Sequence, residues 1–375
     1  MLKINEIRTQ FPIVNEMAYF DIAYGNPLPK CTRDAMTLFM SILQKKGCSI
    51  ARAKAYEKLD EARYNFANLI NASVSEIAFV KNTSEGLNFA ANGIQFNPGD
   101  NVVLNELEHL NNTFCWLRLR KKDVEVRIVP QNNGIVEVDE IASNVDSRTK
   151  AVAVASTTNL GFRFDLEKLG KICKENSAYF IVDAIQSLGI EPLDVKKVGV
   201  DMLSSSAHKG LLGPHGIGFF YCNEEILDEI EPLNVARTCY EPFEDPRTAK
   251  LKYSAVKFEG GNYNYAGVYG VAAGLKLLEQ MDIDEVAKHS FELSEKFRKE
   301  LITLGVNVTN SPKKEERSHI VTFNLPGKSV EKVKNILDEN NVRVSAHYGV
   351  VRASFTHYNT IDEVKKALKI LEEIK

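Results

Sequence analysis

The segment MLSSSAHKGLLGPHGIGFFYC, residues 202–222, indicates how the central sheet of this chain is built. It contains two strands, residues 202–208 and 217–222, joined by the Gly/Pro-rich connection GLLGPHG. That connection is too short for a helix to cross the sheet, so we expect the last strand to run antiparallel to the one before it. The glycines allow the backbone to turn tightly beside Lys209.

Five more short apolar runs precede this segment, and helical patterns lie between them. Several runs are apolar on both faces, as is typical of strands that helices cover on both sides. Strands that alternate with helices predict an α/β fold, here a large αβα domain with a mostly parallel seven-stranded sheet. The expected strands are residues 77–80, 101–106, 125–130, 151–156 and 179–184, and the expected helices are 84–94, 109–121 and 166–176.

The pattern changes after about residue 245, where a long helical region covers roughly residues 265–304. A β-α-β-β-α succession follows and predicts a smaller α+β domain at the C-terminus. Its expected strands are residues 319–325, 342–346 and 350–355, and its helices are 329–340 and 360–375. We therefore expect a large domain over residues 16–250 and a small domain over 251–375, to which residues 1–15 are added.

The composition argues against several classes of protein. The 375 residues include 50 acidic and 47 basic ones, and the net charge of -3 disfavours a binder of nucleic acids or anionic membranes. No run approaches the roughly 18 apolar residues that a membrane span needs, and the N-terminus has no signal-peptide core. The six cysteines form no C-x-x-C pair, so neither a zinc site nor a disulfide scaffold is expected. These observations favour a soluble, cytoplasmic enzyme without a metal.

Lys209 and Asp183 are the first candidates for chemistry. Lys209 follows strand 202–208 and precedes a glycine, which suits an active-site amine, although a solvated surface lysine is the alternative. Asp183 ends the strand YFIVDA, and ligand sites of parallel sheets gather at such ends. A carboxylate in an apolar setting needs a cationic partner, such as a protonated pyridine nitrogen, or it stays protonated. Its alternative role is to cap the next turn.

Thr83, Ser84 and His109 follow two other expected strands. Thr83 and Ser84, in KNTSEG, begin a helix whose free N–H groups and dipole suit an anion, and ordinary helix capping is the alternative. His109 follows strand 101–106, where a lone histidine is more often structural than catalytic. Together, an amine, an anion-binding helix start, a carboxylate and a flat imidazole at neighbouring strand ends match the needs of pyridoxal phosphate.

With these motifs the chain resembles the class V aminotransferase and cysteine desulfurase family of fold-type I pyridoxal-phosphate enzymes. The resemblance runs from YFDIAYGNPLP near residue 19 to VRASFTHYNT near residue 351. It implies pyridoxal 5'-phosphate as cofactor, an amino acid as substrate and a homodimer. The motifs keep the family's order: KNTSEG, ELEHLNN, STTNLGFRFDL, VDAIQSLG, SSAHKGLLGPHGIGF, FEGGNYN and VRASFTHYNT.

The resemblance also implies which residues contact the cofactor ring. Lys209 would hold the cofactor through its amine and later serve as the base at the substrate's Cα. Asp183 would pair with the pyridine nitrogen, and His109 would stack on the ring. Asn159 and Gln186 would flank the phenolic oxygen.

The cofactor phosphate and the substrate carboxylate have their own implied partners. Arg352 would bind the substrate carboxylate. Asn262 stands where many relatives have a threonine that reaches the phosphate of the other subunit, and an asparagine can still donate a hydrogen bond. The phosphate would be held by Thr83, Ser84, Ser206 and His208.

One departure from the family pattern concerns cysteine. Cysteine desulfurases carry a nucleophilic cysteine on a mobile loop shortly before the arginine that matches Arg352. Here that stretch is SAHYGVV, residues 345–351, and the last cysteine of the chain is Cys239. The segment GFRFD, residues 161–165, resembles the aminotransferase or isopenicillin N epimerase-like branch. A persulfide-forming desulfurase is therefore not expected.

Three reactions share all of these residues. Family frequency favours transamination, and a cysteine or other β-lyase, or an epimerase, is the alternative. A non-catalytic descendant is a further alternative, but a scaffold has no need to keep Lys209, Asp183 and Arg352 together. An anion-binding α/β protein without the cofactor is favoured least.

Overall fold

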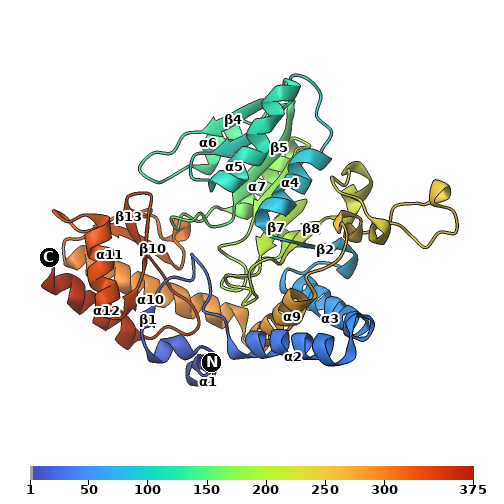
Figure 1. The fold of residues 1–375 in the computed structure, drawn as a ribbon. Helices are drawn as coiled ribbons and strands as arrows, with labels where there is room; N and C mark the ends of the chain where they lie inside the picture. Colours follow the sequence, from blue (N-terminus) through green and yellow to red (C-terminus); the bar gives the residue numbers. More distant parts are fainter. Residues whose placement is uncertain (1–2) are drawn as a thin grey trace.

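A seven-stranded sheet lies at the centre of the structure, a computed structural model that describes residues 3–375 (Figure 1). The strand order is β2-β8-β7-β6-β5-β3-β4. Strand β8 is antiparallel to β7 and to β2, and the other pairs are parallel. The expected sheet, with its one antiparallel strand, is confirmed. The strands are β2 Ile77–Val80, β3 Asn101–Asn105, β4 Glu125–Val129, β5 Thr149–Ala155, β6 Tyr179–Asp183, β7 Met202–Ser206 and β8 Gly218–Cys222.

Two apolar cores lie on the two faces of this sheet, and helices cover both of them. Successive side chains of a strand point to opposite faces, so Met202 belongs to one core and Leu203 to the other. This explains why several of the strands, such as β2, β6 and β8, are apolar on both faces. The αβα layering is thus confirmed. Helices α4 Thr83–Gly93 and α5 Leu110–Leu117 cover one face, and α3 Cys48–Leu69, α6 Val138–Ser143, α7 Leu166–Glu175, α8 Val195–Val198 and α9 Tyr265–Glu279 contribute to the core on the other.

The sequence analysis predicts no helix over residues 30–69, where the structure has α2 Lys30–Lys46 and α3. Ala35, Phe39, Ile42 and Leu43 recur at helical spacing in α2 and pack in one apolar cluster, so the sequence does contain a signal for this helix. Helix α9 packs against both α2 and α3 at the base of the molecule (Figure 1).

The helical region expected over residues 265–304 is two helices, α9 and α10 Ile283–Thr303. The break comes at Asp282, whose carboxylate accepts hydrogen bonds from the backbone N–H groups of Asp284 and Glu285 and caps α10.

A second, four-stranded antiparallel sheet belongs to the C-terminal part, in the order β12-β13-β10-β9. Helices α10, α11 and α12 pack on it around Phe297 and Phe323. The N-terminal strand β1 Ala18–Tyr19 joins this region by pairing with β11 Val342–Arg343. The other elements are α1 Ile4–Arg8, β9 Asn307–Val308, β10 Ile320–Asn324, α11 Val330–Glu339, β12 Ser345–His347, β13 Val350–Ser354 and α12 Ile361–Glu373.

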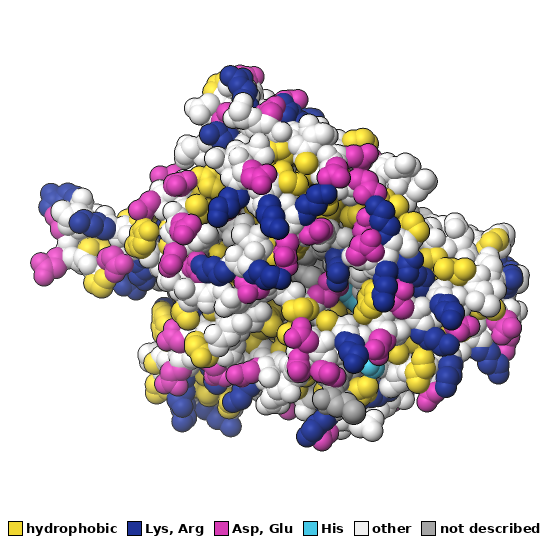
Figure 2. Space-filling view, turned by 180° about the vertical axis from the view of Figure 1, so that it is seen from behind, with side chains coloured by type: hydrophobic (Ala, Val, Ile, Leu, Met, Phe, Trp, Pro, Cys, Tyr) yellow, Lys and Arg dark blue, Asp and Glu magenta, His cyan; other side chains and the backbone are white. Residues whose placement is uncertain are grey.

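Several contacts cross the expected domain limits. Helix α9 contributes to the core of the large sheet, whereas β1 pairs with the C-terminal part. The limits 16–250 and 251–375 with 1–15 therefore stay a prediction. Residues 240–252 project from the large sheet as an arm, whereas Ala255 and Phe258, which follow it, are buried in the core (Figure 1). Over residues 3–375, no helix is long and apolar enough to cross a membrane. Figure 2 shows acidic and basic side chains interspersed over the rear face.

Candidate active site

The strand directions bring the predicted residues to one edge of the large sheet. Strands β2, β3, β6 and β7 all run the same way, so their carboxyl ends meet. Thr83, His109, Asp183 and Lys209 follow or end these four strands.

Lys209 lies in the turn after β7 and is half-buried. Burial, together with the positive charge of Arg352, lowers the pKa of its amine to about 7, although Asp183 and Asp21 act in the opposite direction. At neutral pH a large share of this amine is therefore uncharged. An uncharged amine can form a covalent bond to a carbonyl group or accept a proton.

Asp183 ends β6 and is only 4% exposed. Its Oδ1 accepts a hydrogen bond from the backbone N–H of Ile185 at 3.0 Å. Burial raises the pKa of this carboxyl to about 6, while the Ile185 N–H and the charge of Lys209 lower it. A cation placed against this carboxylate would be strongly favoured, because the buried charge would then be paired.

Thr83 and Ser206 are tied together at the start of α4. The Thr83 N–H donates to Ser206 Oγ at 2.7 Å, and the Ser206 N–H donates to Thr83 Oγ1 at 2.9 Å. Ser84 occupies the same first turn and is half-buried. The first turn of an α-helix has N–H groups without helical partners and the positive end of the dipole, so an anion can bind there.

His208 and His109 border the site from two sides. The His208 ring stacks on His215 with 4.2 Å between centroids, and burial, with the charges of Lys209 and His215, lowers the pKa of His208 to about 4. His109 caps α5, its Nδ1 accepting from the Asn111 N–H at 3.1 Å, so Nε2 carries the proton. Burial and the charges of Lys209 and Arg352 lower the pKa of His109.

Asn159 and Gln186 are both buried. The Asn159 side-chain nitrogen has no hydrogen-bond partner, although it is shielded from solvent. A buried amide without a partner is unfavourable, so this nitrogen suits an oxygen of a bound molecule. The Gln186 side-chain nitrogen donates to the Ala23 carbonyl at 3.2 Å.

Arg352 on β13 faces this group from the C-terminal part and is 3% exposed. Its Nε donates to Ser345 Oγ and its Nη1 to the Asn159 carbonyl, both at 3.0 Å. Its Nη2 lies 3.8 Å from Asp21 Oδ1. Burial lowers the pKa of Arg352 and raises that of Asp21 to about 6.

Asn262 is the one predicted residue that lies apart. It is exposed, and its Oδ1 accepts a hydrogen bond from Arg52 Nη2 at 3.4 Å. Asn262 lines a cavity of about 350 Å³ together with Lys81 and Glu85. No other residue predicted for the site lines this cavity.

Asp21, Glu108 and Ser345 also lie at this site, and none of them was predicted from the sequence. Glu108 is buried and its carboxylate accepts hydrogen bonds from the Asn105 and Asn112 side chains and from the Ala155 N–H, at 2.6–2.8 Å. Burial raises its pKa to about 7. The signals that could have found two of them are in motifs already quoted, YFD and ELEHLNN, where an acid stands among apolar or amide side chains.

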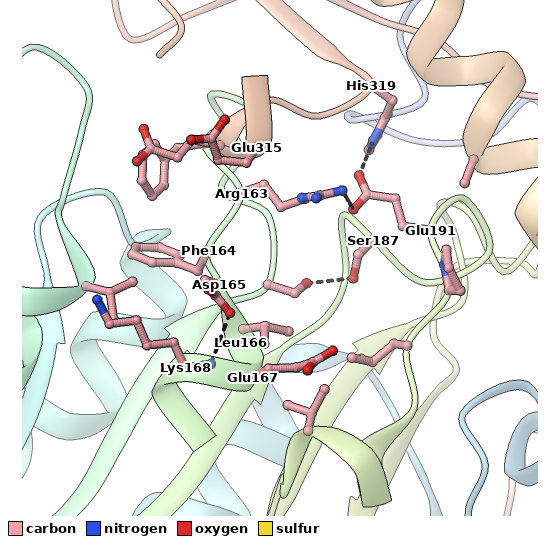
Figure 3. A pocket seen from close by; sticks show the side chains of 18 of the residues that line it. Arg163, Phe164, Asp165, Leu166, Glu167, Lys168, Ser187, Glu191, Glu315 and His319 are labelled. Carbon is pink, nitrogen blue, oxygen red and sulfur yellow. Dashed lines mark hydrogen bonds and ion pairs between the residues drawn. The ribbon is translucent and has the colours of Figure 1, made fainter. Parts of the chain in front are cut away.

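A larger cavity of about 1020 Å³ lies between the large sheet and the C-terminal part, and none of the predicted site residues line it. Figure 3 shows Arg163, Glu191 and His319 together on one side, where Glu191 accepts a hydrogen bond from His319 at 3.2 Å and lies 3.9 Å from Arg163. Ser156 and Ser187 also line this cavity, and their hydroxyl groups share a hydrogen bond of 2.6 Å. The Ser156 N–H donates a hydrogen bond to the Asp183 carbonyl.

The residues at the sheet edge fit pyridoxal phosphate. Asp183 is a buried carboxylate that favours a cation, Asn159 offers a buried donor without a partner, and the start of α4 suits a phosphate. Lys209 provides an amine whose pKa is lowered to about 7, so the uncharged form is accessible at neutral pH. Fold and site together define a pyridoxal-phosphate-dependent enzyme of fold type I.

The chain belongs to the aminotransferase class-V family, whose profile matches residues 18–367. It is similar to a probable cysteine desulfurase of Methanothermobacter thermautotrophicus, with 34% identity over 100% of this chain and 98% of the relative. A probable cysteine desulfurase of Pyrococcus abyssi is also 34% identical, over 98% of this chain and 97% of that relative. The solved structure of a cysteine desulfurase from Thermococcus onnurineus NA1 has 31% sequence identity to this chain and a TM-score of 0.92. The match covers 100% of this chain and 98% of the solved one.

Proposed function

We propose that the enzyme breaks the Cβ–S bond of cysteine or an S-substituted cysteine and releases the sulfur directly, without forming a persulfide on the protein. The names of the similar proteins support chemistry at cysteine sulfur and favour this alternative over transamination. The observation that carries the proposal is the connection between β12 and β13. It is a tight turn at Tyr348 and Gly349, adjacent to the strand of Arg352, and it contains no cysteine.

Four of the six thiols are buried, which supports direct release, whereas Cys31 on α2 is half-buried and Cys48 on α3 is exposed. Cys115, Cys173 and Cys222 are buried, and burial raises the pKa of each, to about 12 for Cys115. Cys239 is also buried, with its thiol donating to the Glu259 carbonyl. A thiol that stays protonated is a poor acceptor of sulfur. All six cysteines are free, as expected for a protein of the reducing cytoplasm, where we place it.

Each residue of the site then has a task. Lys209 would hold the cofactor and afterwards take the proton from the substrate's Cα. Asp183 would stay ionised against the pyridine nitrogen, His109 would cover the ring, and Arg352 would bind the substrate carboxylate. When bound, the cofactor supplies an electron-withdrawing ring that stabilises negative charge at Cα. Asn159 and Gln186 would donate to the phenolic oxygen, and the phosphate would be held by Thr83, Ser84, Ser206 and His208.

The proposed enzyme is a homodimer. Large apolar side chains lie exposed on α2 and α3, among them Leu38, Met40 and Tyr64, each more than half exposed. Clustered exposed apolar residues are typical of a protein interface. Asn262, exposed and apart from its own site, would then be available to the partner's site. Sedimentation should give a dimer, and a fully active monomer would refute the shared site.

The test is a product analysis of the purified holoenzyme. With cysteine, we expect sulfide, pyruvate and ammonia in equal amounts. Alanine together with a persulfide on the protein would instead indicate a desulfurase. A keto acid that forms only when a second keto acid accepts the amino group would indicate an aminotransferase.

A further inference from the structure

We propose that His347 donates a proton to the sulfur atom as it leaves the substrate's Cβ. This inference rests on the proposed function, and it assigns to the site a catalytic residue that the sequence analysis does not include. It is carried by the geometry of the β12–β13 hairpin and by the charged groups that His347 faces.

The hairpin register places His347 on the same face as Arg352. Ser345 pairs with Arg352 and His347 pairs with Val350 across the two antiparallel strands. Because side chains alternate along a strand, Ser345, His347 and Arg352 share a face. The hydrogen bond between Arg352 Nε and Ser345 Oγ, at 3.0 Å, is direct evidence of that shared face.

The turn brings the imidazole to the end of this face. Tyr348 and Gly349 both have positive φ, 47° and 77°, as the two central residues of a tight hairpin turn do. The Tyr348 ring lies against the His347 ring with 4.3 Å between centroids. Tyr348 is 55% exposed, whereas His347 is half-buried, so the tyrosine is the more solvent-exposed of the two contacting rings.

Groups from three separate elements act on His347. Partial burial lowers its pKa, and so do the positive charges of Arg352 on β13, His109 after β3 and Lys209 after β7. Arg352 contacts Asn159 and Asp21 from the face that it shares with His347, so the imidazole lies on the side of the hairpin that is turned toward the proposed substrate site. A bound substrate carboxylate would neutralise Arg352, so the substrate itself would raise the proton affinity of His347.

Two proton transfers make up the proposed step. Lys209 takes the Cα proton, and the electron pair of that C–H bond becomes the second bond between Cα and Cβ. The Cβ–S bond breaks and its electron pair stays on sulfur. The imidazolium of His347 gives its proton to that sulfur, so a neutral thiol leaves. His347 regains a proton from water, and the proton on Lys209 neutralises the hydroxide that remains. Water then converts the unsaturated amino acid to pyruvate and ammonia.

The experiment compares two leaving groups in the holoenzyme. S-ethylcysteine releases a basic thiolate that needs a proton, whereas β-chloroalanine releases chloride, which needs none. His347→Gln keeps a polar side chain of similar reach but cannot transfer a proton. It should lower kcat for S-ethylcysteine by about 100-fold or more and leave kcat for β-chloroalanine unchanged. Tyr348→Phe keeps the contacting ring and serves as the matched control, with wild-type rates on both substrates.

The pH profile gives a second readout. In the wild type, kcat for S-ethylcysteine should fall as the pH rises through the pKa of His347, and this limb should be missing in His347→Gln. An equal loss of kcat on both substrates, or no loss of kcat on either, would show that His347 does not donate the proton. Neither result would contradict the proposed function. If the wild type consumes β-chloroalanine but releases no thiol from S-ethylcysteine and no sulfide from cysteine, both the proposed function and this inference are wrong.

Discussion

Replacing Arg352 with alanine removes the proposed anchor of the substrate carboxylate. A guanidinium has five N–H donors. Arg352 uses one on Nε and one on Nη1 within the protein, which leaves three for a ligand. Those on Nη1 and Nη2 can meet a carboxylate with two parallel hydrogen bonds. A charged hydrogen bond contributes about 1.5–3 kcal/mol, so two contribute at least about 3 kcal/mol, or roughly 100-fold in affinity.

The buried neighbour of Arg352 must be controlled for. Asp21 lies 3.8 Å from Nη2, and Arg352→Ala leaves this carboxylate without its cation. Removing one partner of a buried pair typically destabilises a protein by about 3–5 kcal/mol. The double variant Arg352→Ala with Asp21→Asn removes both charges, so it should recover stability in denaturant unfolding but not affinity.

The assay compares cysteine with cysteamine, which lacks the carboxylate. Affinity is measured from the change in the cofactor's visible absorption band. We expect Arg352→Ala to weaken cysteine binding about 100-fold and to leave cysteamine nearly unaffected. Arg352→Lys should recover only part, because it keeps the charge but loses the planar fork. Equal losses for both amines, or recovery of cysteine affinity in the double variant, would refute the reasoning.

Three further predictions concern the cofactor site and its support. Borohydride should fix the cofactor on the peptide that contains Lys209, as mass spectrometry would show, and a label on another lysine would contradict the assignment. Asp183→Asn removes the charge at nearly constant volume and should weaken cofactor binding and abolish turnover, so a near-wild-type variant would exclude the proposed pairing. The pKa of Glu108 is raised to about 7, so the folded protein holds this proton more tightly than the unfolded chain does. Its contribution to stability, about 3 kcal/mol, is complete below about pH 4.5 and is lost as the pH rises through 7. Denaturant unfolding between pH 4.5 and 8 should therefore show a steeper loss for the wild type than for Glu108→Gln, and parallel curves would disprove this account.

The sheet and part of the site follow from local sequence patterns. Buried parallel strands have apolar runs that can be recognised without a structure, and the short GLLGPHG connection alone requires the antiparallel β8. Once strands alternate with helices, their carboxyl ends must meet, so Lys209, Asp183 and Thr83 are predicted to share one edge. Helix α2 is not predicted above, although Ala35, Phe39 and Ile42 recur at helical spacing, and only two of its residues are fully buried.

The charge partners of the site were decided only by the tertiary structure. Asp21 comes from the N-terminal strand region and Arg352 from β13, more than three hundred positions later, yet the two lie 3.8 Å apart and both are buried. His347 belongs to the site because the hairpin register puts it on the face of Arg352. A local pattern reports which residues are buried and at what period. It cannot report which charged group lies opposite, because that depends on pairings between distant segments. Burial has the largest effect on the pKa values of Lys209 and Asp21, and those pairings then modify them.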